Sequence, residues 1–77
     1  MTIVLPIRFR TADKERREAI VRAARQHGAR VAAGPVDDVW EVVVDGDDLP
    51  ATARRALVAA LDRRVPGWQV DATIYGG

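Results

Sequence analysis

The sequence contains no cysteine, no serine and no asparagine, and His27 is its single imidazole. The absence of cysteine excludes disulfides, thiolate metal sites and cysteine nucleophiles. The absence of serine and asparagine removes the serine nucleophile and the asparagine oxyanion donor. No second His or Cys can share a metal ion with His27. We therefore expect a protein that is not an enzyme and that holds no metal and no cofactor.

Long apolar runs are also missing. No run approaches the roughly 20 residues that span a bilayer, and the N-terminus has no basic region followed by an apolar stretch and a cleavage site. We expect a cytoplasmic protein without a membrane partner. The 77 residues predict a single domain over 1–77. Because a chain of this size buries only about 60% of its unfolded surface, an oligomer interface would add stability, and we expect a homo-oligomer.

The formal net charge is only +1, but the charges are unevenly distributed along the chain. Residues 1–34 carry eight basic and three acidic side chains, whereas residues 35–77 carry four and eight. If the two halves interleave in the fold, their opposite charges can lie next to each other and offset one another. If they do not, the surface has one basic and one acidic region.

Two stretches alternate as strands with one buried face do. In 40–46, Trp40, Val42 and Val44 alternate with Glu41, Val43 and Asp45. A carboxylate is costly inside an apolar core, so we place Trp40, Val42 and Val44 inward. In 2–10, the row Ile3, Leu5, Ile7 and Phe9 alternates with Thr2, Val4, Pro6, Arg8 and Arg10. Proline cannot donate to a ladder, which predicts a break in pairing at Pro6.

A first helix is predicted between these strands. Thr11 is the expected N-cap, and Gly28 is the expected terminator after His27. One face of this helix carries Ala12, Ala19, Ile20, Ala23 and His27, and Arg16 lies beside this face. A short strand follows at about Arg30–Ala33, ended by Gly34-Pro35, and Asp37-Asp38 form a turn into 40–46.

A second helix is predicted after Gly46. Asp47 or Asp48 is the expected cap, with Pro50 in the first turn. The buried stripe of this helix is Ala53, Leu57, Ala60 and Leu61, and Arg63 and Arg64 lie at its C-terminal end. Val65-Pro66-Gly67 ends the helix. The last strand is expected at Trp68–Tyr75, with Trp68, Val70, Ala72 and Ile74 alternating with polar residues.

The predicted order is βαββαβ, and an offset of 37 residues superposes the two halves. Two interleaved right-handed βαβ units resemble the ferredoxin-like arrangement. We therefore expect an α+β sandwich with an antiparallel four-stranded sheet in the order 4-1-3-2 and both helices on one face. The first and third strands are the expected central pair.

The other face of such a sheet is uncovered, and a half-apolar open face is a plausible docking surface. The main hypothesis is a non-enzymatic interaction or assembly module that self-associates or docks a partner protein through this face or an edge strand. The residues expected there are Val4, Pro6, Arg8, Arg10, Val39, Glu41, Val43 and Tyr75.

A nucleic-acid-binding module is the alternative. The first half of the chain would supply a basic surface of Arg16, Arg17, Arg22, Arg25 and Arg30. Single-strand readers of this topology stack bases on aromatics of the two central strands, and no aromatic stands at the predicted open positions of these strands. A solvated helix face explains the same arginines.

Two families resemble parts of the chain. One segment resembles the strand–turn–helix half of acylphosphatases: residues 40–61, WEVVVDGDDLPATARRALVAAL. Acylphosphatases use an Arg in a glycine-rich loop and an Asn. The chain has Arg8 and Arg10 but neither that loop nor an Asn. The two ends of the chain resemble propeptide-type inhibitors of subtilisin-like proteases, through IVLPIRF at the start and VPGWQVDATIYGG at the end. That resemblance implies a protease inhibitor whose tail, Tyr75, Gly76 and Gly77, enters the protease cleft.

Overall fold

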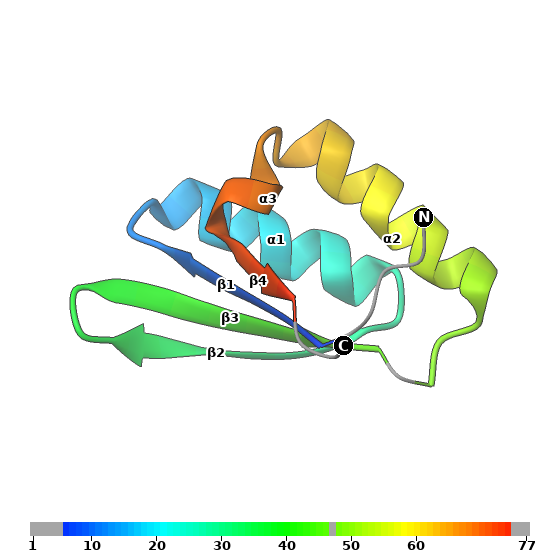
Figure 1. Ribbon diagram of the computed structural model, residues 1–77, viewed down its shortest axis with the longest axis horizontal. Helices are drawn as coiled ribbons and strands as arrows, with labels where there is room; N and C mark the ends of the chain where they lie inside the picture. Colours follow the sequence, from blue (N-terminus) through cyan, green and yellow to red (C-terminus); the bar gives the residue numbers. More distant parts are fainter. Residues whose placement is uncertain (1–5, 47, 75–77) are drawn as a thin grey trace.

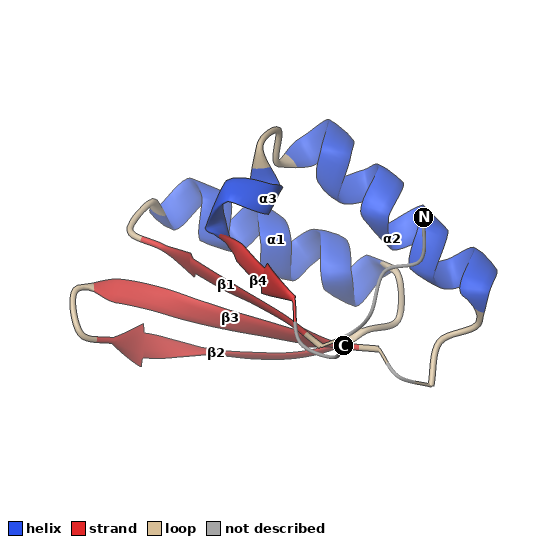
Figure 2. Cartoon of the chain, in the orientation of Figure 1, coloured by secondary structure: helices blue, strands red, loops and turns tan. Residues whose placement is uncertain are grey.

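The computed structural model describes residues 6–46 and 48–74. Along the chain the elements are β1 (Ile7–Thr11), α1 (Lys14–Gln26), β2 (Arg30–Val36), β3 (Val39–Asp45), α2 (Ala51–Arg64), α3 (Trp68–Asp71) and β4 (Ala72–Ile74). The helices lie together on one side of the sheet (Figures 1 and 2). The predicted βαββαβ order is confirmed, with one short extra helix before the last strand.

The four strands form an antiparallel sheet in the order β2-β3-β1-β4. This is the predicted order 4-1-3-2 read from the other edge, and β1 and β3 are the central pair. Ile7 lies opposite Val44, and the register continues to Thr11 opposite Trp40. The strand starts directly after Pro6, where the sequence predicts a break in pairing.

The core lies between the sheet and the helices. In β1, Ile7 and Phe9 are fully buried and alternate with the more exposed Arg8 and Arg10. Val42 and Val44 of β3 face the same side. The helices contribute Ile20, Ala23, Ala24, Leu57, Ala60 and Leu61. Removing these side chains from water drives the layers together, at roughly 25 cal/mol per Å² of apolar surface.

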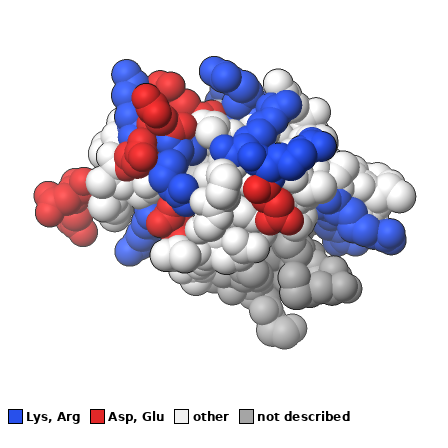
Figure 3. All heavy atoms as spheres, turned by 90° about the horizontal axis from the view of Figure 1, so that it is seen from above, with Lys and Arg blue, Asp and Glu red and all other residues white. Residues whose placement is uncertain are grey.

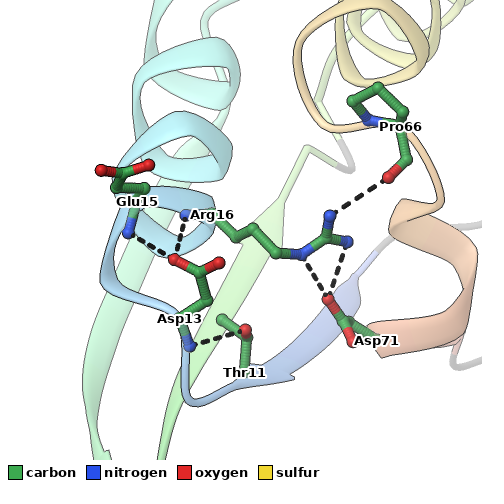
Figure 4. A network of polar contacts seen from close by, with 6 residues as sticks. All are labelled: Thr11, Asp13, Glu15, Arg16, Pro66 and Asp71. Atoms are coloured by element: carbon green, nitrogen blue, oxygen red, sulfur yellow. Dashed lines mark hydrogen bonds and ion pairs between the residues drawn. The ribbon is translucent and has the colours of Figure 1, made fainter.

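The start of α1 differs from the prediction. Thr11 is not the N-cap, because it is still part of β1 and pairs with Trp40. Asp13 caps the helix instead: its Oδ1 accepts hydrogen bonds from the backbone N–H groups of Glu15 and Arg16 at 2.9 and 3.3 Å. The Thr11 hydroxyl accepts the N–H of Asp13 (Figure 4). Ala12 consequently precedes the helix and is exposed rather than in its buried row.

The end of α1 agrees with the prediction. Gly28 has a φ of +81°, a left-handed conformation that glycine adopts without the steric cost a side chain adds. The N–H groups of Gly28 and Ala29 donate to the carbonyls of Arg25 and Ala24. This pair of bonds is the Schellman termination, and it satisfies carbonyls that the last helical turn leaves open.

Trp40 is not a core residue, contrary to the prediction. It lies on the helix side of the sheet, as its register with Thr11 requires, but it is 37% exposed. The guanidinium carbon of Arg17 lies 4.0 Å from the centroid of its ring. At this end of the sheet the ring is therefore covered by a charged side chain of α1 instead of by an apolar one.

β2 is longer than predicted and runs through Gly34-Pro35 to Val36. The prediction that these two residues end the strand is wrong for a geometric reason. β2 is an edge strand, and a proline is tolerated on an edge where its missing N–H faces away from the neighbouring strand. The turn at Asp37-Asp38 is confirmed, and Asp37 adopts a φ of +53°.

α2 begins at Ala51, with Pro50 in the N-cap position instead of the first turn, and Pro50 makes no side-chain cap hydrogen bond. Asp48 is not the N-cap, since Pro50 holds that position, and its carboxylate accepts from Arg30 at 3.2 Å; Asp47 lies outside the described residues. The predicted buried stripe is present in Leu57, Ala60 and Leu61, with Ala53 partly exposed.

The strand predicted at Trp68–Tyr75 is largely wrong. Residues Trp68–Asp71 form the single turn α3, and only Ala72–Ile74 pair with β1. A strand would bury Trp68 and Val70 together, whereas Trp68 is buried and Val70 is 88% exposed. Gly67, at a φ of +78°, turns the chain so that Trp68 enters the core. The predicted superposition of the halves therefore fails over this segment.

Candidate interaction surface

The open sheet face has a charged centre. Glu41 lies between two arginines of β1: its Oε2 is 3.3 Å from the Nε of Arg8 and 3.0 Å from the Nε of Arg10. These side chains point away from the helices because they alternate with the buried Ile7 and Phe9. The structure thus brings together three of the residues that the sequence places on this face.

Apolar side chains flank that charged centre. Val43 lies opposite Arg8, and Val39 closes the β2–β3 hairpin opposite Val36. Both Val39 and Val43 are partly exposed, as is Pro6 just before β1. Val4 and Tyr75, the other two residues expected on this face, lie outside the described residues. The described part of the open face is therefore a mixed surface with ion pairs at its middle.

The edge of the sheet at β2 is the second feature of this side of the molecule. Within residues 6–46 and 48–74, β2 pairs with β3 alone. In a two-residue hairpin turn, the residues on either side of the turn form a backbone hydrogen-bonded pair. Val36 and Val39 flank the turn at Asp37-Asp38 and therefore form such a pair. Because such pairs alternate along an antiparallel ladder, the backbone groups of Val31, Ala33 and Pro35 face outward. This edge offers two N–H donors and three carbonyl acceptors.

Two hollows border β2, one on each face of the sheet. On the helix side, a groove of about 510 Å³ separates the flank of α1 from Ala33. On the open face, a hollow of about 170 Å³ lies along residues 32–36 and reaches Glu41 and Val43. A chain lying along β2 would therefore have room for side chains on both sides.

The groove on the helix side is basic. Its α1 wall carries Arg17, Arg22 and Arg25 with a single carboxylate, Glu18, and its apolar floor includes Val21. Arg17 stacks on Trp40. Arg22 and Arg25 form no ion pair with any residue that the structure describes. These two guanidinium groups are available to an anionic ligand.

Two of the five arginines of the predicted basic surface are engaged elsewhere. Arg16 joins the start of α1 to the C-terminal segment: its guanidinium contacts the Oδ2 of Asp71 at 2.9 and 3.0 Å and the carbonyl of Pro66 at 3.1 Å (Figure 4). Arg30 extends from β2 to Asp48 at 3.2 Å. The surface of α1 therefore depends on Arg17, Arg22 and Arg25.

The contribution of α2 to the basic surface was not predicted from the sequence. Its residues Arg54, Arg55, Arg63 and Arg64 lie in the half of the chain that is acidic overall. Together α1 and α2 carry nine basic and three acidic side chains, a net charge of +6, while the remaining described residues carry three and seven, a net charge of −4. Basic side chains are spread over the helix side, with acidic ones among them (Figure 3). Summing the charges over each predicted helix, instead of over each half of the chain, would have shown that both helices are basic.

The described residues show no cluster of three or more His, Cys, Asp or Glu side chains that could hold a metal ion. Asp45 and Asp48 lie beside Arg30, at 4.0 and 3.2 Å, and His27 forms the C-cap of α1. Over the same residues, neither the length nor the apolarity of any helix is sufficient to cross a membrane.

Comparison of the chain with protein-family models, curated proteins and solved structures finds no match. The resemblances to acylphosphatases and to subtilisin propeptides receive no support, and the tail residues 75–77 lie outside the described part of the chain.

Proposed function

We propose that this protein is a non-enzymatic interaction module that docks another polypeptide along the β2 side of its sheet. The observation that carries the proposal is the edge of β2, seven residues long, whose outward backbone groups pair with no other strand of the described chain and which has a hollow on each face. An added strand gains affinity from main-chain hydrogen bonds and specificity from pockets that receive alternate side chains.

The composition of β2 supports this role. Its middle, Ala32, Ala33 and Gly34, carries no bulky side chain that would keep a second strand away. Edge strands that must stay free are commonly protected by charges, by proline, by bulges or by covering segments. In β2 the charged residue is Arg30 at the first position and the proline is Pro35 near the other end, so the stretch between them is open to an added strand.

Ala33→Pro tests the proposal, because it removes an outward N–H donor and leaves the inward ladder intact. Peptides selected from a displayed random library for binding to the natural chain should lose binding to this variant. The control is Ala51→Pro, at the first residue of α2, where proline is well tolerated. Equal binding of the selected peptides to both variants would refute docking at β2.

A nucleic-acid-binding function is a second candidate, favoured by the net charge of +6 on the two helices. This function requires that affinity for a single-stranded oligonucleotide falls steeply as salt rises. It also requires that Arg22→Gln on α1 and Arg55→Gln on α2 both weaken binding. An affinity that does not change with salt would exclude it.

A further inference from the structure

The groove beside β2 indicates what kind of chain it receives. A strand added to β2 would alternate its side chains between the basic groove on the helix side and the hollow on the open face. Side chains entering the groove meet Arg22 and Arg25, which have no acidic partner among the described residues. Carboxylates would complement these guanidinium groups.

The hollow on the open face has the opposite chemistry. Its lining is mainly small and apolar, from Ala32 to Val36 of β2 and Val43 of β3, with the carboxylate of Glu41 at one side. Glu41 is already held by Arg8 and Arg10. This hollow therefore suits small apolar side chains and disfavours further carboxylates.

A second copy of this chain fits the edge poorly. Two copies joined through β2 would bring their α1 helices side by side on the same face of the joined sheet. Each α1 carries five basic and two acidic side chains, a net charge of +3, and like charges in proximity oppose association. The charge of the groove favours an acidic partner over a copy of itself.

We infer that the ligand of this edge is an extended acidic segment of another protein, in which acidic and small apolar residues alternate. The segment adds to β2 as a fifth strand. Its carboxylates face Arg22 and Arg25, and its apolar side chains enter the hollow beside Val43. This inference rests on the proposed function and specifies the partner's chemistry.

The test uses the isotope-labelled full chain and a synthetic peptide of the same length as β2, in which Glu and Val alternate. Titration should move the amide signals of Val31 and Ala33 most. Exposed ion pairs contribute up to about 1 kcal/mol each, or roughly fivefold in Kd. Arg22→Gln with Arg25→Gln should therefore raise Kd by up to about 25-fold, whereas Arg54→Gln with Arg55→Gln, the control on α2 that removes the same number of charges, should leave Kd unchanged.

Three results would overturn the inference. If a Lys–Val peptide moves the β2 amides as strongly as the Glu–Val peptide, the acidic specificity is wrong while docking at β2 stands. If the Glu–Val peptide leaves Val31 and Ala33 unmoved, the edge is not its site. If a thymidine oligonucleotide displaces the peptide, and its own binding falls equally with Arg22→Gln and Arg55→Gln, the basic surface serves nucleic acid.

Discussion

At the scale of single residues, the two tryptophans have different roles from those their sequence positions indicate. Trp68 is the largest core side chain and is 2% exposed. Its ring packs against Phe9 with centroids 5.9 Å apart, and its Nε1 donates to the Oδ1 of Asp62 at 2.7 Å. Trp40 keeps 37% of its surface in water. The core is thus closed by Trp68, the first residue of α3, rather than by Trp40 in β3.

We predict that Trp68→Ala lowers the free energy of unfolding by about 3–5 kcal/mol, the usual cost of removing a large core aromatic. Trp40→Ala should cost less, about 1–2 kcal/mol, because its ring is only partly buried and the rest of the loss is an exposed cation–π contact. Urea denaturation followed by circular dichroism measures both. Should Trp68→Ala fail to fold, Trp68→Phe provides the comparison, and a larger loss for Trp40→Ala than for Trp68→Phe would contradict the assignment.

The role of Trp68 was not predictable from alternation alone. The segment from Trp68 to Ile74 alternates apolar and polar residues as a strand does. A single helical turn instead places residues three apart on one side, and in α3 this brings Trp68 into the core while Asp71 reaches Arg16. That ion pair joins residues 55 positions apart, so no local pattern could indicate it.

At the scale of the elements, β2 shows how the position of a strand in the sheet decides what a proline does. Pro35 lies at an outward position of an edge strand, where no partner within the described chain needs its N–H. In a central strand the same proline would remove a ladder bond. The sequence pattern alone could not show that β2 lies at the edge, so Gly34-Pro35 resembled a terminator.

The same geometry gives a paired prediction. Ala32→Pro removes an inward N–H that bonds to β3 opposite Val43, and we expect it to lower the free energy of unfolding by about 3 kcal/mol. Ala33→Pro removes only an outward N–H and should change that free energy by no more than about 0.5 kcal/mol. Thermal unfolding of the two variants measures the difference. The reverse ranking would show that the inward and outward positions of β2 are exchanged.

At the scale of the whole molecule, the positive charge gathers on the helix layer, although along the chain the first half is basic and the second half acidic. Each half contributes one of the two main helices, so interleaving the halves places both basic helices on the same side of the sheet (Figure 1). The element order, the sheet order and most of the core could be predicted, because they follow from periodicity and glycine positions. The basic groove could not, because it depends on which helix flanks the edge strand.

Self-association, if driven by the sheet, should use the open face rather than the edge. We predict that light scattering after size-exclusion chromatography shows an oligomer that Val43→Asp shifts toward monomer, because the substitution places a carboxylate on the apolar flank of this face. Val70→Asp is the matched control, since Val70 is 88% exposed on α3, and it should have no effect. A strictly monomeric natural chain at high micromolar concentration would contradict this prediction.

The two edges of the sheet differ in length, since β2 has seven residues whereas β4, as far as the structure describes it, has three. Open-ended growth by strand addition requires each molecule to offer two matching edges, one for the preceding unit and one for the next. Among the described residues only one edge is long enough to hold a partner strand, so the proposed docking would stop after a single addition. Such a fold would expose backbone for recognition without starting a fibre.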